Sequence, residues 1–169
     1  SLEVTNESTD STVYVIYKPV VPTATPATST DIQGKAQTGI PTYKHADGTE
    51  LKPTTDNPAK FVGTEETTIP ATKDGKTVGT YTIDPTTGAV TFTPEKDFVG
   101  TATGVTVQAT ATITNANGKT ATITSDATYT PTVVAAVPTA NPTTSKDVQG
   151  ATQTGTPTFA GTTVQVNGE

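Results

Sequence analysis

The sequence predicts an all-β protein, an antiparallel β-sandwich or a partly open barrel of roughly seven to nine strands. Two observations lead to this class. No segment places apolar residues at helical spacing over several turns, and Thr, Gly and Pro interrupt every candidate helix. Short alternating segments are separated by turn signals, and the 44 Thr residues favour an extended backbone because their Cβ atoms are branched.

The chain contains one segment twice. Residues 22–43 and 138–159 align without a gap at a constant offset of 116, and 14 of the 22 aligned positions are identical. Because this period is the size of a domain rather than of a solenoid coil, we expect a tandem array. Its parts would be one complete module over 22–137, the closing strands of a preceding module over 1–21 and the opening of a following module over 138–169.

The first half of the chain carries weak strand signals. A run of β-branched and aromatic residues predicts one strand over 12–20. The prolines of the segment 22–26 exclude a helix and predict a semi-rigid extended linker. Short strands are expected around Ile32 and over 37–43, and the region 44–70 is expected to be mostly loop with short strands.

The second half carries clearer hairpins. Their elements are, in order, a turn at 74–75, a strand over 78–83, a tight connection over 84–88, a returning strand over 89–93, a strictly alternating strand over 105–114, a turn over 115–118 and a closing strand that ends near Tyr129. The apolar members of these strands predict the core, which would contain Tyr81, Ile83, Val90, Phe92, Val105, Val107, Ile113 and Ile123.

Composition limits the function classes. The net charge is -6 and all ten basic residues are Lys, so the chain lacks the basic surface of a nucleic-acid or anionic-membrane binder. No apolar run approaches the roughly 18 residues of a membrane span. The absence of Cys fits either a cytosolic protein or a bacterial exterior, and the richness in Thr, Pro and Ala favours the exterior. The first residues, SLEVTNESTDST, show no signal peptide, so we expect an internal part of a longer protein.

Three stretches together resemble a known repeat. They are ATPATSTDIQGKAQTGIPTY in the opening, VGTYTIDPTTGAVTFTPEKDFVGTATGVTV in the middle and ATYTPTVV at the close. Their sequences and spacing are similar to the CshA-type fibril repeat of streptococcal and related Gram-positive surface adhesins. Proteins of that family are exported, anchored to the cell wall, and carry a non-repetitive N-terminal adhesive region on a long series of repeats. The resemblance implies a fibril module at the cell surface. Its partners would be neighbouring repeats, and host or bacterial ligands would bind other regions.

We predict no catalytic, cofactor-binding or metal-ligating residue. The single His, His45, stands beside an Asp-Gly turn, and without a second His or a Cys it has no partner for a metal site or a nucleophile–base pair. The nine Asp residues stand singly, mostly at turns, and form no calcium-binding loop, although two loops meeting in space could hold calcium incidentally. Glu65, Glu66 and Glu95 would form an acid–base pair only if folding brought them together.

An intramolecular amide crosslink between Lys and Asn is also considered. Lys18 is the only Lys beside a strongly apolar strand, but its counterpart in the next closing segment is Thr130, so a shared crosslink is not expected. The single glycosylation sequon, at Asn6, is interpreted as chance in a chain rich in Ser and Thr.

Three function classes are compared. A structural stalk requires tandem modules, polar surfaces and no site, which the sequence indicates. A repeat that itself binds a host matrix protein or glycan would need an exposed aromatic or basic cluster, yet the chain has only nine aromatic residues and most lie in predicted strands. A polysaccharide-active enzyme would need paired carboxylates and usually Trp platforms, and Trp is absent. We expect a stalk rather than an enzyme, with the adhesive repeat as the alternative.

Overall fold

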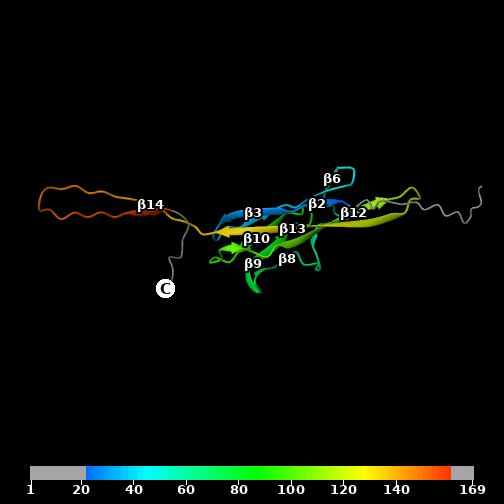
Figure 1. The fold of residues 1–169 in the computed structure, drawn as a ribbon, viewed down its shortest axis with the longest axis horizontal. Coiled ribbons are helices and arrows are strands. Elements are labelled where there is room, and N and C mark those ends of the chain that lie inside the picture. Colours follow the sequence, from blue (N-terminus) through cyan, green and yellow to red (C-terminus); the bar gives the residue numbers. More distant parts are fainter. Residues whose placement is uncertain (1–21, 161–169) are drawn as a thin grey trace, which may run out of the picture.

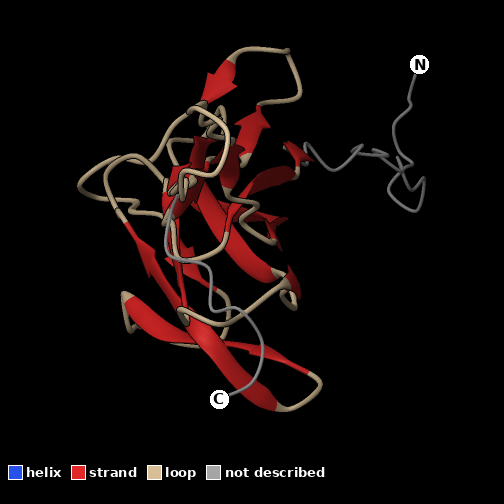
Figure 2. Ribbon diagram, turned by 90° about the vertical axis from the view of Figure 1, so that its left-hand side faces the viewer, coloured by secondary structure: helices blue, strands red, loops and turns tan. Residues whose placement is uncertain are grey.

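The structure is a computed structural model that describes residues 22–160, which form strands and loops and no helix. It confirms the predicted all-β class. Figure 1 shows an elongated body in which β12 (Val105–Thr114) and β13 (Thr120–Val134) run along the long axis. Figure 2 views the body down that axis. The strand predicted over 12–20 lies outside the described residues.

Two sheets pack against each other. The first contains, in spatial order, β4 (Gln37–Gly39), β10 (Val90–Pro94), β9 (Lys76–Ile83) and β8 (Thr68–Lys73). The second contains β11 (Gly100–Thr101), β13, β12 and β7 (Lys60–Phe61), and β3 (Ala27–Ile32) pairs with β13. All of these pairs are antiparallel except that of β3 with β13, which is parallel.

Two smaller sheets complete the described chain. One contains β2 (Thr23–Thr25), β5 (Thr42–Lys44) and β6 (Glu50–Leu51). The other is the pair of β14 (Thr139–Asn141) with β15 (Thr158–Ala160), which projects from the body beyond the end of β13 (Figure 1). The region 44–70 holds short strands between loops, as predicted.

The predicted hairpin turns are confirmed. Asp74 (φ 50°) and Gly75 (φ 80°) both have left-handed backbone, as in a type I′ turn, and join β8 to β9. Asp84 Oδ1 accepts the backbone N–H and the hydroxyl of Thr86, at 2.9 and 2.7 Å, in the connection from β9 to β10. Asn115 Oδ1 accepts two backbone N–H groups at the tip of the β12–β13 hairpin. Local turn chemistry therefore sets the antiparallel pairs.

Aromatic side chains join the two sheets in the core. The ring centroids of Tyr81 and Phe92, both on the first sheet, are 5.4 Å apart, and Tyr81 meets Tyr129 of the second sheet edge-on at 6.1 Å. The Tyr81 hydroxyl donates to the carbonyl oxygen of Thr103 at 2.7 Å, which satisfies its polar end. The predicted core residues that are buried are Tyr81, Ile83, Val90, Phe92, Val105 and Val107.

Ile113 and Ile123 are only half-buried, which corrects the predicted core. They pair with Ala121 and Ala111 on the outer part of the β12–β13 ribbon, whereas β7 joins β12 only at residues 107 and 108. Figure 1 shows this ribbon extending past the rest of the sandwich. Alternation identifies the inward face of a strand but does not reveal how far the opposite sheet reaches.

Two predicted boundaries are wrong. The segment 22–26 is not a linker, because it contains β2, which pairs with β5. The closing strand does not end near Tyr129 but continues to Val134, held by β11 on one side and by β3 on the other. Both differences come from pairing with strands that are distant in the sequence, which local proline and threonine signals do not reveal.

Candidate functional site

The repeated segment joins the two sheets of the sandwich. β3 lies against β13 in the second sheet, while β4 pairs with β10 in the first. Between them the chain turns at Gly34, whose φ of 80° is left-handed, and the Lys35 N–H donates to the carbonyl oxygen of Ile32 at 3.2 Å. The segment that the chain contains twice therefore closes one side of the sandwich.

Hydrogen bonds among four polar groups hold this connection between β3 and β4 against β13. We call these groups the opening cluster: Ser29, Gln37, Tyr129 and the Thr132 carbonyl. Ser29 Oγ donates its one hydrogen to Gln37 Oε1 at 2.6 Å. The Tyr129 hydroxyl is also 2.6 Å from Ser29 Oγ and is therefore the donor in that second bond. Gln37 Nε2 donates to the Thr132 carbonyl oxygen at 2.9 Å. Because Gln37 and Tyr129 are buried, losing any of these bonds would leave a buried polar atom unpaired.

Sequence analysis did not predict the opening cluster. The available signal was the identity of Ser29 with Ser145 and of Gln37 with Gln153 in the two copies of the repeated segment. Gln is rarely buried, and its position on a three-residue strand gives no alternation to interpret. The cluster holds strands together, and two of its three side chains, those of Gln37 and Tyr129, are buried.

Three buried tyrosines have raised pKa values, but they have structural roles. Loss of water around the phenol is the main cause in Tyr43, Tyr81 and Tyr129, and the negative charge of Asp126 adds to the shift in Tyr43. The Tyr43 hydroxyl donates to the carbonyl oxygen of Val107 at 2.8 Å. Because each of the three hydroxyls bonds to a carbonyl oxygen or to Ser29, none is placed beside a general base.

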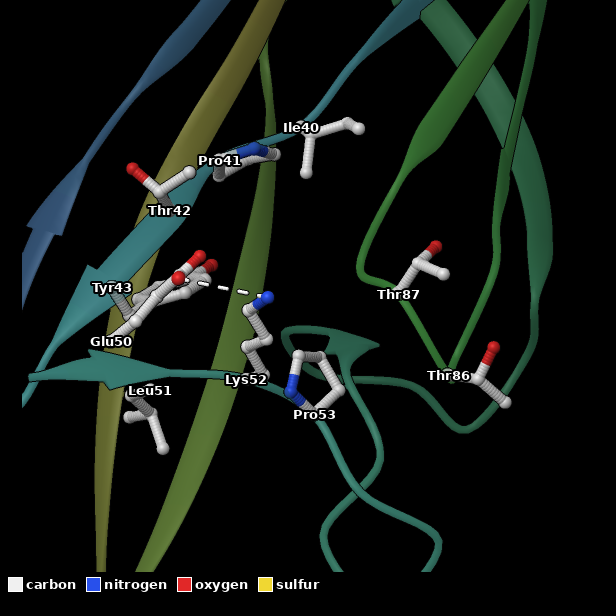
Figure 3. Close-up of a pocket in the computed structure, with 10 residues that line it drawn as sticks. All are labelled: Ile40, Pro41, Thr42, Tyr43, Glu50, Leu51, Lys52, Pro53, Thr86 and Thr87. Atoms are coloured by element: carbon white, nitrogen blue, oxygen red, sulfur yellow. Dashed lines mark ion pairs between the residues drawn. The ribbon is translucent and has the colours of Figure 1, made fainter.

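A surface pocket of about 300 Å³ lies beside β5 and β6. Figure 3 shows Ile40 and Pro53 on its border, facing two threonines of the connection from β9 to β10. Its charged groups, Glu50 and Lys52, pair with each other at 3.6 Å and are exposed. Its one aromatic residue, Tyr43, is buried in the core. The lining therefore supplies neither a pair of carboxylates nor an open aromatic face.

His45 and the aspartates are parts of turns. The His45 N–H donates to the carbonyl oxygen of Thr49 at 2.8 Å in the β5–β6 hairpin, and the half-buried His45 side chain borders a shallow depression next to Ile113. Asp47 Oδ1 accepts the N–H and hydroxyl of Thr49, which lowers the pKa of Asp47. The structure thus supports the prediction that aspartate side chains cap turns.

The glutamates singled out in the sequence lie on exposed loops. Glu65 forms an ion pair with Lys60 at 2.8 Å, and the Glu66 N–H donates to the hydroxyl of Thr64 at 3.0 Å. Glu95 follows β10, and its N–H donates to the carbonyl oxygen of Val78 at 2.8 Å. The contacts of these residues are structural ones within loops and strand ends.

Some predictions fall outside the described part of the chain, namely those on Lys18 and on Asn6. Over residues 22–160, no group of three or more His, Cys, Asp or Glu side chains is placed to hold a metal ion. The same residues contain no helix long and apolar enough to cross a membrane.

The second copy of the repeated segment reproduces the pairing of the first. β2 pairs with β5 through residues 23↔44, 24↔43 and 25↔42, and β14 pairs with β15 through 139↔160, 140↔159 and 141↔158. Every pair is shifted by the same 116 positions that separate the two copies in the sequence. The repeat is therefore one of structure as well as of sequence.

The chain matches a known protein family. Residues 19–133 match the family model described as the surface adhesin CshA repetitive domain. No curated protein matches the chain. The matched range contains the first two stretches that resemble the fibril repeat and all but the last residue of the third.

Proposed function

Because the chain belongs to the family of surface adhesin CshA repetitive domains, we propose that it is a structural stalk module. The family is one of repeats in cell-surface adhesins. In our proposal the module has no catalytic role and, together with neighbouring repeats of the same chain, forms a fibril. The fibril holds an adhesive region away from the Gram-positive cell wall to which the protein is anchored.

The repeated strand pairing is the observation that carries this proposal. The pair β14–β15 follows β13 after only four residues, 135–138, and projects from the body along its long axis (Figure 1). A short connection of this kind, ending in Pro138, restricts bending more than a long flexible linker would. End-to-end modules with short joints are what a stalk requires.

The structure also supports an estimate of the rise per repeat. Pro22, the first residue of the repeated segment, is held beside Ser125, whose hydroxyl donates to the Pro22 carbonyl oxygen at 3.2 Å. Pro138, the first residue of the second copy, follows Ser125 by 13 residues, and most of these belong to β13. At about 3.3 Å per extended residue, each repeat would add about 40 Å to the fibril.

A binding assay separates a stalk from an adhesive repeat. The chain would be immobilised and offered fibronectin, mucin and a glycan array, with the full-length surface protein as the positive control. The proposal expects no saturable binding to the repeat alone. Saturable binding that Ile40→Ser weakens, with the exposed Thr38→Ser as the matched control, would assign a ligand to the pocket beside β5 and would contradict the proposal.

A further inference from the structure

We propose that the projecting ribbon, the part of the β12–β13 hairpin over residues 111–124, is a docking surface between consecutive repeats. Its occupant is the segment 18–21 of this chain, Lys-Pro-Val-Val, which comes before the described residues and would end the preceding repeat. The role of this contact between repeats rests on the proposed stalk function, whereas the docking of the segment does not.

The projecting ribbon reaches past the point where the module begins. Ser125 Oγ donates to the Pro22 carbonyl oxygen at 3.2 Å, so the chain enters the module beside Ser125. From there β13 extends back five residues to Thr120 and stays paired with β12 as far as Thr114. At about 3.3 Å per residue the overhang is about 17 Å long. Figure 1 shows it at the end of the body opposite to β14.

The course of the chain after Pro22 shows the direction from which it arrives. Pro22 lies at Ser125, and five residues later Ala27 pairs with Tyr129. The chain therefore runs beside β13 and parallel to it, with an almost constant offset between the two residue numbers. The same course, continued backwards, leads along the projecting ribbon toward its tip.

On this course Val20 reaches Ile123. Pro22 disfavours helical geometry in Val21, which precedes it, so a sharp turn away from the ribbon is disfavoured. Side chains alternate along an extended chain, and Pro22 is buried against the module. Val20 would therefore face the same side as Pro22, toward the ribbon.

The projecting ribbon presents its apolar face on that side. Ile123 and Ala121 follow Ser125 at alternate positions of β13, and Ile113 of β12 is paired with Ala121. Both isoleucines are half-buried and Ala121 is exposed. The other face of the ribbon carries only threonines, namely Thr112, Thr114, Thr120, Thr122 and Thr124. Because a two-stranded ribbon is marginally stable on its own, an apolar segment over this face would stabilise it.

A shallow depression lies where the segment would pass. It is bordered by His45, Ala46, Asp47, Thr49 and Ile113. β2 pairs with β5 in antiparallel register, with Thr23 opposite Lys44. Two residues further back, this register puts Val21 opposite Ala46. The registers with β13 and with β5 thus lead the segment to the same place independently.

The contact would stiffen the joint between two repeats. An overhang of about 17 Å is close to half of the rise of about 40 Å that we expect for each repeat. The ribbon of one repeat would therefore lie beside the end of the preceding one and span the proline-containing joint. A joint that is held along this length resists bending more than the connecting chain alone would.

The test introduces pairs of cysteines into the whole chain, which has no Cys of its own. Val20→Cys with Ile123→Cys should form a disulfide in oxidised glutathione, because docking brings the two Cβ atoms within reach of each other. Val20→Cys with Thr122→Cys is the matched control, since Thr122 lies on the opposite face of the ribbon. Mass spectrometry of the digested protein should show the first pair crosslinking at least about tenfold faster than the control pair.

A second measurement uses the natural chain and requires no variant to fold. In protein with labelled methyl groups, nuclear Overhauser contacts are expected between Val20 and Ile123. Equal crosslinking of the two cysteine pairs, or no Overhauser contact between these two residues, would overturn the proposal. Either result would leave the stalk function standing, whereas saturable ligand binding by the repeat would contradict the stalk function without affecting this contact.

Discussion

Gly39 and Gly155 occupy the same position in the two copies of the repeated segment, but only Gly39 faces an aromatic ring. In the first copy the Tyr129 ring fills the space that a Cβ atom on Gly39 would need. In the second copy the nearest atoms to such a Cβ belong to one threonine side chain. A larger side chain would therefore be excluded at position 39 by the Tyr129 ring, whereas at position 155 it would meet only one threonine side chain.

This difference predicts unequal effects of one substitution. Gly39→Ala should lower the free energy of unfolding by about 1–3 kcal/mol, because the added methyl group forces the buried Tyr129 ring or the β4 backbone to move. Gly155→Ala is the matched control and should leave the unfolding transition of the sandwich unchanged. Chemical denaturation followed by tyrosine fluorescence measures both variants, and equal destabilisation would contradict the packing described for Gly39.

A second prediction concerns the centre of the core. Phe92 is fully buried and touches the aromatic rings of Tyr81 and Phe98, with centroids 5.4 and 6.4 Å away. Phe92→Ala should cost about 3–5 kcal/mol, a large part of the stability of a module with so few large apolar residues. Ile123→Ala on the projecting ribbon should cost clearly less. Differential scanning calorimetry would show whether Phe92→Ala lowers the melting temperature more than Ile123→Ala does, as expected.

The third prediction concerns alkaline pH. The folded-state pKa values of Tyr43, Tyr81 and Tyr129 are raised above the value of about 10 for an exposed tyrosine. Below that pH the phenols are neutral in both states and the stability is unaffected. As the pH rises above it, the unfolded state loses protons that the folded state retains, so the free energy of unfolding falls.

Tyrosinate absorbance at alkaline pH checks this prediction. These three tyrosines should ionise together with the loss of β-sheet circular dichroism rather than in an earlier step. The Tyr129→Phe variant should lose one phenol from that cooperative step. Ionisation of all tyrosines near their ordinary pKa in a protein that stays folded would contradict the burial described here.

The hairpins could be predicted from the sequence because their signals are local. Asp74-Gly75 specifies its turn through two left-handed residues, and alternation over 105–114 matches β12 residue for residue. The parallel pair of β3 with β13 could not be predicted, because its partners are about a hundred residues apart and Pro131 interrupts the strand signal. The burial of Gln37 depends on the same distant pairing. Ile113 and Ile123 lie in correctly predicted strands but are only half-buried, because the strand pattern does not reveal how far the opposite sheet extends over them.

The length of a fibril with a known number of repeats tests the central claim most directly. Small-angle X-ray scattering on proteins with two, four and six consecutive repeats would give their maximum dimensions. The stalk account predicts a linear rise of about 40 Å per repeat, from the 13 residues of mostly extended chain between Ser125, whose hydroxyl bonds to Pro22, and Pro138. Growth close to the square root of the number of repeats would mean flexible joints and would contradict the account.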